Sequence, residues 1–385
     1  MTDLITIPLT DDLVHGAAEL EPTQRGLLPH RLPAWARAQN TDPQLAKAES
    51  QPSGVRLVFD TAATTIELEL IRTTVNYAGL TLRPDGIVQL VVDGTPTAED
   101  ATTAGTAIVL DPATGTPTTT HGAAHVSRFA DLPPRTKTVE LWLPHNETIE
   151  LVALRTDAPV TPRVDTRRTW VHHGSSISHG SNATHPLGTW PAVASRIADV
   201  NLVSLGFGGS ALLDPFTART IRDTPADVIS LKLGINIVNA DLMRLRAFGP
   251  AVHGFLDTIR EGHRTTPLLV VSPIYCEIHE NTPGPGAFDP EAFMAGRMQF
   301  RATGDPAEVA AGKLTLTVIR RELERIVAAR ADANLHYLDG LELYGQTDAT
   351  EHPLPDALHP DADTQRLIGE RFAALAFAGD GALAV

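Results

Sequence analysis

Residues 169–178 read Thr-Trp-Val-His-His-Gly-Ser-Ser-Ile-Ser, an apolar stretch that runs into a glycine and a group of serines. The aromatic and β-branched residues at its start predict a short buried strand. A glycine at the end of that strand permits a tight turn into a helix, from which a serine side chain can project. The segment therefore predicts a strand–turn–helix unit with Ser176 as a candidate nucleophile. An ordinary serine-rich loop is the alternative for this segment taken alone.

Towards the C-terminus, predicted strands and helices alternate. Their residue ranges are 200–205, 227–233, 267–272 and 334–338 for the strands, and 189–199, 241–261, 314–329 and 364–377 for the helices. Gly249-Pro250 is expected to break or kink the second of these helices. Alternation of this kind is typical of a parallel sheet covered by helices on both faces. In such sheets, functional residues lie on loops at the C-terminal ends of the strands.

The first part of the chain has a different pattern. Short alternating or β-branched runs, separated by turn residues, occupy positions 55–59, 65–70, 87–92, 138–143 and 148–154. This pattern predicts an all-β sandwich or jelly roll. The Thr-, Ala- and Gly-rich residues 95–124 are expected to form long exposed loops. We place the β domain at 1–160 and an α/β domain at 165–385.

Composition limits the classes of function. The chain has 385 residues, of which 42% are hydrophobic, so two domains with sizeable cores are expected. A formal net charge of −15 disfavours nucleic acid and anionic membrane surfaces as partners. The first residues show no signal peptide and no membrane anchor, so a cytoplasmic location is expected. Cys276 is the single cysteine, which excludes an internal disulfide, and inert packing is the preferred interpretation of its thiol.

Two glycine-containing segments follow predicted strands. Residues 205–210 read Leu-Gly-Phe-Gly-Gly-Ser, and 233–236 read Leu-Gly-Ile-Asn. A glycine N–H without a neighbouring side chain, or an asparagine amide, can donate to an oxygen that becomes negative during acyl transfer. A dinucleotide-binding loop is disfavoured because its third glycine is missing: position 211 is alanine.

Near the C-terminus, residues 355–360 read Pro-Asp-Ala-Leu-His-Pro. Asp356 stands three residues before His359, so one short turn can present both side chains together. The carboxylate can hold the imidazole in one tautomer, which leaves the other ring nitrogen free to take a proton from a nucleophile.

Together these blocks of Ser, Gly, Asn and His, in this order, resemble the SGNH or GDSL-type hydrolases, a family of esterases and lipases. The resemblance runs from about Trp170 to the end of the chain. It implies a three-layer α/β/α sandwich with a flavodoxin-like parallel sheet, preceded by a β domain as in one GDSL-like subfamily. Ser175 departs from the family motif, which has aspartate there. The resemblance also implies site roles: Ser176 as nucleophile, Asp356 and His359 as acid and base, and Ser176, Gly209 and Asn236 as oxyanion hole, with Gly208 a competitor for Gly209.

The expected function is that of a serine esterase acting on short-chain, acetyl-type carboxylic esters, with a deacetylase of a sugar or natural product as one form. A thioesterase or acyltransferase using the same triad is an alternative, and a catalytically silent binding protein is another. The expected substrate is a small-molecule ester, and no metal or organic cofactor is expected.

Two parts of the chain keep open interpretations. Residues 276–313 lack periodicity and form either a lid or binding loop, or a tolerated insertion. The β domain is either a sugar-binding or substrate-shaping module, or a domain that serves packing or mediates oligomers. His185, His279 and His352 lack the tight spacing of metal ligands, so a metal site is disfavoured.

Overall fold

The computed structural model describes residues 4–80, 82–111 and 114–384. The chain divides into two compact units. The first comprises the chain up to Arg37, Glu49–Thr166 and Thr184–Leu187, and the second comprises Ala38–Ala48, Arg167–Ala183 and Gly188 onwards. The main division thus falls after Thr166. In addition, Ala38–Ala48 belongs to the second unit although it lies within the first part of the chain, and Thr184–Leu187 belongs to the first unit although it lies within the second part.

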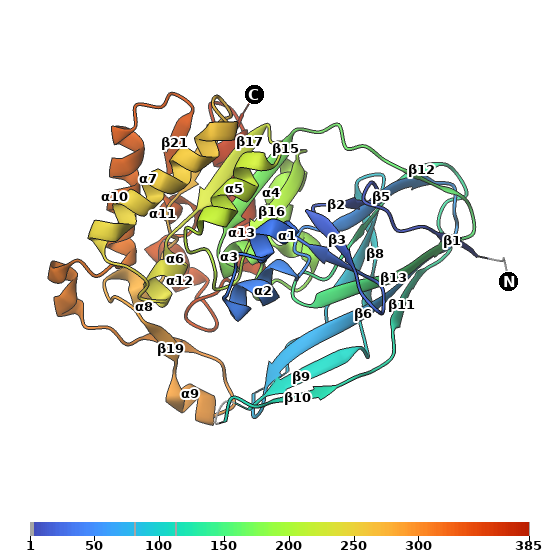
Figure 1. Cartoon of the computed structure of the whole chain (residues 1–385), viewed down its shortest axis with the longest axis horizontal. Helices are drawn as coiled ribbons and strands as arrows, with labels where there is room; N and C mark the ends of the chain where they lie inside the picture. Colours follow the sequence, from blue (N-terminus) through green and yellow to red (C-terminus); the bar gives the residue numbers. More distant parts are fainter. Residues whose placement is uncertain (1–3, 81, 112–113, 385) are drawn as a thin grey trace. The chain divides into compact units, whose positions relative to one another are not determined.

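The first unit is built from two β-sheets (Figure 1). The eight-stranded sheet runs, in spatial order, β10 (Pro117–Thr120), β9 (Thr106–Leu110), β6 (Ile66–Tyr77), β13 (Thr148–Thr156), β4 (Leu27–His30) and β3 (Glu19–Pro22), with β1 (Ile5–Ile7) beside β13 and β11 (His125–Phe129) beside β6. The six-stranded sheet runs β14 (Val160–Pro162), β5 (Arg56–Thr61), β12 (Lys137–Trp142), β7 (Ile87–Val92) and β8 (Thr95–Ala101), with β2 (Val14–His15) beside β5. The short helix α1 (Ala34–Arg37) also belongs to this unit.

Both sheets contribute to one apolar core. Alternate residues of β6 point inward, so that Ile66, Leu68 and Leu70 are fully buried, and Leu57 and Leu141 reach the same core from the other sheet. Each such leucine or isoleucine contributes about 1.5–3 kcal/mol by burial. The predicted β-sandwich is therefore confirmed for this part of the chain.

The expectation of long loops over 95–124 is wrong, because strands β8, β9 and β10 lie there. All four residues of β10 and almost all of β8 are exposed. An exposed strand needs no inward apolar side chain, so the alternation that reveals a strand is absent from the sequence. Threonine is nevertheless a good strand former because it is β-branched.

The second unit contains a five-stranded sheet in which all neighbouring strands are parallel. Its spatial order is β16 (Asn201–Gly206), β15 (Thr169–Gly174), β17 (Val228–Lys232), β18 (Leu268–Val271) and β21 (Leu335–Leu338). The first strand in the chain thus lies second in space, which is the flavodoxin-like order with a switch point beside β15. The predicted parallel sheet and its fold class are confirmed.

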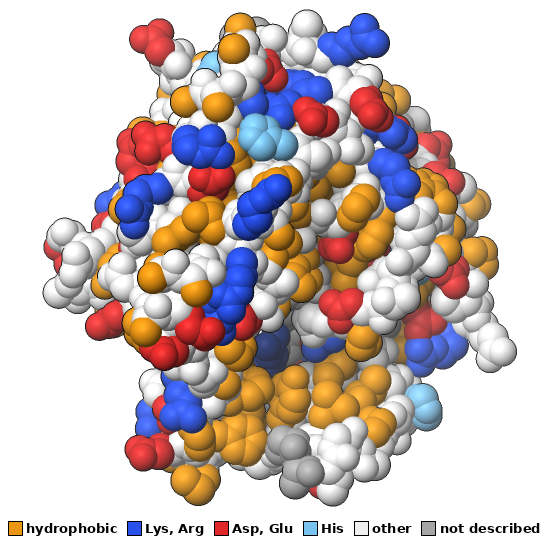
Figure 2. Space-filling model, turned by 60° about the vertical axis from the view of Figure 1, so that its left-hand side comes forward, with side chains coloured by type: hydrophobic (Ala, Val, Ile, Leu, Met, Phe, Trp, Pro, Cys, Tyr) orange, Lys and Arg blue, Asp and Glu red, His pale blue; other side chains and the backbone are white. Residues whose placement is uncertain are grey.

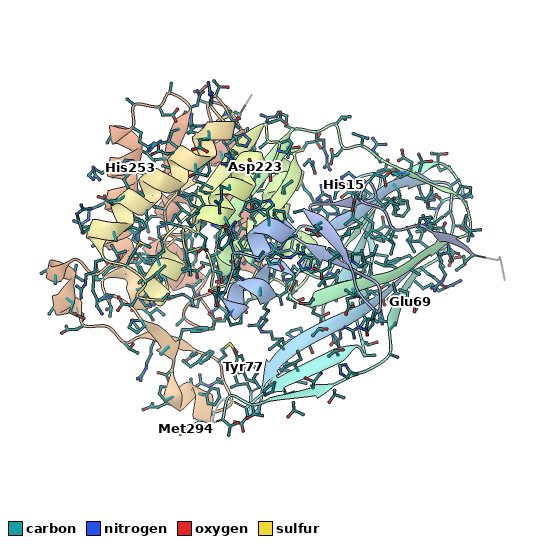
Figure 3. The ribbon with its side chains drawn as sticks, in the orientation of Figure 1. His15, Glu69, Tyr77, Asp223, His253 and Met294 are labelled. Atoms are coloured by element: carbon teal, nitrogen blue, oxygen red, sulfur yellow. The ribbon has the colours of Figure 1, made fainter. Side chains whose placement is uncertain are left out.

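Helices cover both faces of this sheet (Figure 1). One layer contains α4 (Trp190–Ile197), α13 (Ala362–Phe372) and the short π-helix η3 (Ala373–Phe377). The other contains α5 (Pro215–Asp223), α7 (Leu245–Gly262) and α10 (Leu316–Ala329). Side chains of strand β15 contact both helix layers. The Trp170 ring stacks on Phe372 of α13, and the His173 ring stacks on Phe255 of α7. Asp223 and His253, labelled in Figure 3, mark the neighbouring helices α5 and α7.

Of the two outcomes predicted at Gly249-Pro250, the break is wrong and the kink stays a prediction. Helix α7 is continuous from Leu245 to Gly262 with Pro250 inside it. Burial of its apolar face, which includes Phe248, Val252 and Phe255, stabilises the helix and offsets the loss of the hydrogen bond that proline cannot donate.

The long segment without periodicity contains short elements. These are α8 (Glu277–Glu280), the hairpin strands β19 (Gly286–Phe288) and β20 (Phe300–Ala302), α9 (Pro290–Met294) between them, and η2 (Pro306–Ala311). The remaining short helices of the described chain are α2 (Pro43–Glu49), α3 (Ser176–His179), η1 (Pro186–Gly188), α6 (Ile235–Asn239), α11 (Gly340–Leu343) and α12 (Gln346–Glu351). None of the described helices is both long and apolar enough to span a bilayer. Acidic and basic side chains are interspersed on the face shown in Figure 2.

Candidate active site

The turn after β15 presents Ser176 at the start of a single helical turn. Ser175 is the N-cap of α3 and accepts a hydrogen bond from the Ile177 N–H at 3.3 Å, while Gly180 closes the turn with φ 101°. A Cβ at position 174 would lie 2.3 Å from Ser178 Oγ, so only glycine fits there. The Ser176 N–H, at the first position of the helix, has no acceptor among the described residues.

The structure brings Ser176, His359 and Asp356 together. His359 Nε2 lies 2.9 Å from Ser176 Oγ, and His359 Nδ1 lies 2.7 Å from Asp356 Oδ2. The other carboxylate oxygen, Asp356 Oδ1, accepts the N–H groups of Leu358 at 3.0 Å and of His359 at 2.6 Å. One turn of chain therefore fixes the carboxylate and the imidazole against each other, as the spacing in the sequence predicts.

The charge state of Asp356 determines the direction of these bonds. Burial would raise the pKa of Asp356. The pKa nevertheless lies below its usual value, because the carboxylate accepts a hydrogen bond from the His359 ring, interacts with the charge of that ring, and accepts two backbone N–H groups. An ionised carboxylate only accepts, so His359 Nδ1 carries the proton that it donates to Asp356. Nε2 of the neutral ring is then an acceptor, and Ser176 Oγ–H donates to it.

The glycine loop after β16 distinguishes its two candidate donors. The Gly208 N–H donates to His179 Nδ1 at 3.3 Å and is therefore already used. The Gly209 N–H has no acceptor within the described parts of the chain. A Cβ added at Gly208 would lie 3.8 Å from Ser176 Cβ, so this loop borders the nucleophile. The geometry favours Gly209 over Gly208 as an oxyanion donor.

The third donor comes from the loop after β17. Asn236 lies in α6, is 2% exposed, and accepts the Ala211 N–H with its Oδ1 at 3.1 Å. This bond orients the amide so that Nδ2 points the other way, where no described residue accepts from it. Gly234, which precedes the helix, has φ 124°, and a Cβ there would lie 2.7 Å from Ile319 Cγ2. Glycine is therefore required to set Asn236 in place.

Three side chains that no pattern in the sequence indicates also contact the site. Asn182 Nδ2 lies 3.4 Å from Asp356 Oδ2, and the Phe300 ring meets His359 edge-on with centroids 5.5 Å apart. Gln44 Nε2 donates to the Gly208 carbonyl at 2.8 Å. Phe300 belongs to the long segment 276–313, so part of that segment packs against the acid–base turn. No local motif marks any of the three, because each acts through a tertiary contact.

Neither a metal site nor a cysteine nucleophile is indicated by the described residues. Among the described residues, no three His, Cys, Asp or Glu side chains are grouped to hold a metal ion, and this includes His185, His279 and His352. Cys276 is buried and its Sγ lies 3.4 Å from the Ala357 carbonyl. Burial raises the pKa of this thiol to about 12, so it stays protonated and is a poor nucleophile.

Comparisons with known proteins indicate a related family. Residues 167–281 match the model of the GDSL-like Lipase/Acylhydrolase family. No curated protein sequence is significantly similar to the chain. Together with the fold, this match over residues 167–281 supports the predicted class, because the second unit resembles the SGNH/GDSL-type hydrolases.

Solved structures resemble the chain over nearly its whole length. A salicylyl-acyltransferase, SsfX3, from a tetracycline biosynthetic pathway is 25% identical, with a TM-score of 0.77 over 96% of this chain and 95% of that one. A GDSL-like lipase from Bacteroides ovatus is 17% identical, with a TM-score of 0.67 over 96% of each chain. An acetyl xylan esterase, Est2A, from Butyrivibrio proteoclasticus is 10% identical, with a TM-score of 0.52 over 96% of this chain and 97% of that one. The last two show that the fold is shared.

Proposed function

We propose that the protein is a serine esterase that cleaves short-chain carboxylic esters through an acyl-enzyme on Ser176. The observation that carries the proposal is the continuous hydrogen-bonded series Ser176 Oγ–His359 Nε2 and His359 Nδ1–Asp356 Oδ2. Such a series activates a hydroxyl that is a weak nucleophile on its own.

The mechanism has two acyl-transfer steps. Ser176 Oγ attacks the ester carbonyl carbon while His359 Nε2 takes the hydroxyl proton, and Asp356 stabilises the resulting imidazolium. The tetrahedral intermediate collapses, the bond to the leaving alcohol breaks, and His359 returns the proton to the alcohol oxygen. A water molecule then attacks the acyl-enzyme while His359 takes one of its protons. The bond between the acyl carbon and Ser176 Oγ breaks, and His359 returns the proton to Oγ, which releases the carboxylic acid and restores Ser176.

The three N–H groups without acceptors complete this mechanism. The N–H groups of Ser176 and Gly209 and the Asn236 amide follow neighbouring strands of the sheet, Ser176 and Asn236 in the short helices α3 and α6 and Gly209 in the glycine loop, where they can receive the oxyanion of each intermediate. Loss of one such donor typically lowers turnover about 10²–10³-fold. No step requires a metal or an organic cofactor.

A second candidate is acyl transfer to a hydroxyl or thiol acceptor instead of water. It is favoured by the likeness to a salicylyl-acyltransferase over 96% of this chain. The acyl-enzyme is common to both reactions, so the same residues would serve, and the acceptor that reaches the acyl-enzyme decides the product.

The test uses the purified protein, p-nitrophenyl acetate and a fluorophosphonate probe. Wild type should hydrolyse the ester and gain one phosphonyl adduct, and Ser176→Ala should lose both. Ser178→Ala is the matched control, because this serine lies in the same turn but bonds to His172 Nε2 at 2.8 Å. It should still be labelled. Turnover of Ser176→Ala near the wild-type rate would end the proposal. Adding alcohols and thiols and measuring new ester or thioester against free acid separates the two candidates.

A further inference from the structure

The peptide between Gly208 and Gly209 has no side chain to fix its orientation. Glycine on both sides leaves the peptide plane free to turn over, and Gly209 has φ 77°, which other residues rarely adopt. If the plane turned over, the Gly209 N–H would point away from its present direction. Hydrogen bonds must therefore fix this peptide if its N–H is to serve at the site.

Two bonds hold Gly208 from opposite ends. Its N–H donates to His179 Nδ1 at 3.3 Å, and its carbonyl accepts from Gln44 Nε2 at 2.8 Å. In a planar trans peptide the C=O and the following N–H point in opposite directions. Gln44 at the Gly208 oxygen therefore directs the Gly209 N–H away from Gln44, and a donor on the carbonyl also polarises that N–H and strengthens it.

Gln44 is itself held in place. It lies in the first turn of α2, where its N–H donates to Asp42 Oδ1 at 2.9 Å. Leu45 and Ala48 of the same helix are buried, at 2% and 1% exposure. At the start of the segment, Gln39 accepts a hydrogen bond from Arg219 of α5.

The contact between Gln44 and the loop is also close. A Cβ at Gly209 would lie 3.1 Å from Gln44 Cγ and 3.4 Å from its Nε2. The whole segment Ala38–Ala48 belongs to the same compact unit as the glycine loop.

We propose that Gln44 is a positioning residue for the oxyanion hole: by holding the Gly208 carbonyl, it aims the Gly209 N–H at the oxygen that becomes negative during acyl transfer to Ser176. This inference rests on the proposed function. Gln44 suits the task because its amide is a neutral donor of fixed geometry and brings no charge of its own to the glycine loop.

The experiment compares Gln44→Met, which keeps the length of the side chain but has no donor, with Gln39→Met in the same segment. With p-nitrophenyl acetate, Gln44→Met should lower kcat by roughly tenfold with KM little changed. The Gly209 N–H is still present in this variant, but it is no longer held in the direction of the oxyanion. Gln39→Met should leave kcat near wild type. Gln44→His, whose Nε2 can reach the same carbonyl, should recover most of the lost kcat.

The unfolding temperature of each variant separates positioning from packing. The proposal holds if Gln44→Met loses kcat while it unfolds at the same temperature as Gln39→Met. It is overturned if Gln44→Met and Gln39→Met have equal kcat, or if the loss follows a lower unfolding temperature and Gln44→His restores nothing. Wild-type turnover equal to that of Ser176→Ala would overturn the proposed function, and the role of Gln44 with it. A Ser176-dependent reaction that is indifferent to Gln44 overturns the present inference alone.

Discussion

Asp356→Asn should lower turnover about 10⁴-fold without unfolding the protein, because it reverses the direction of one hydrogen bond. The new side chain has nearly the same shape, but one of its two ends is now an N–H₂ group. Which end faces His359 decides whether the ring can accept a proton from Ser176.

The backbone around position 356 decides the orientation. One carboxylate oxygen, Oδ1, accepts the N–H groups of Leu358 and His359 at 3.0 and 2.6 Å. Turning the amide so that N–H₂ meets those two donors would leave both without partners, at about 1–3 kcal/mol each. The amide oxygen therefore stays with the backbone, and the N–H₂ group faces His359 Nδ1.

His359 must then accept at Nδ1, and its proton moves to Nε2, where it blocks transfer from Ser176. A 10⁴-fold loss corresponds to about 5.4 kcal/mol of transition-state stabilisation. Asn182 contacts the same side of the carboxylate at 3.4 Å, a weak bond, so Asn182→Ala should cost only a few-fold.

The assay measures kcat for p-nitrophenyl acetate and urea unfolding for wild type, Asp356→Asn and Asn182→Ala. Nitrogen NMR of the His359 ring reports which nitrogen carries the proton. Asp356→Asn turnover within tenfold of wild type, with the proton still on Nδ1, would refute the orientation argument.

Two further substitutions have opposite aims, one to weaken catalysis and one to stabilise the fold. Gly209→Ala should lower kcat by up to about 10²-fold, because alanine keeps the N–H but resists φ 77° and its Cβ meets Gln44 Cγ at 3.1 Å, so that the N–H is displaced. Gly208→Ala, whose Cβ makes only ordinary contacts of 3.7 Å or more, should cost less, and equal losses in a kcat comparison would contradict this. Lys232→Met should raise the free energy of unfolding by about 2–4 kcal/mol at pH 6, because burial, and then the Arg320 charge, lower the pKa of Lys232 to about 7. Folding then favours the neutral amine, so wild type gains stability as pH rises from about 7 towards 10.5 and the methionine variant does not. Urea unfolding at pH 6 and pH 10 checks this, and an equal difference at the two pH values would count against it.

The parallel sheet could be predicted because its strands are buried. Val228–Lys232 and Leu268–Val271 are fully buried, and such strands appear in sequence as short, mostly apolar runs. Helix α5 could not be predicted, because Pro215–Asp223 is short and rich in polar residues. Strands β1 to β4 could not be predicted, because each has only two to four residues, too few for an alternation of apolar and polar residues to show.

The site could be predicted only where its residues lie close together in the sequence. Asp356 and His359 are three positions apart, so their pairing is local and visible. The choice between Gly208 and Gly209 depends on His179, which takes up one of the two N–H groups through a tertiary contact. Gln44 stands 164 positions before Gly208, and no pattern around it marks the contact.

The assignment of Ala38–Ala48 to the second unit limits how the enzyme can be dissected. A fragment cut at the natural-looking boundary and beginning at Arg167 would carry the nucleophile, base and acid, yet lack Gln44. Such a minimal fragment should label slowly with a fluorophosphonate even if it folds. If the N-terminal β domain were exchanged for another, in the laboratory or during evolution, the new chain would still need the segment Ala38–Ala48, or another segment that donates to the Gly208 carbonyl.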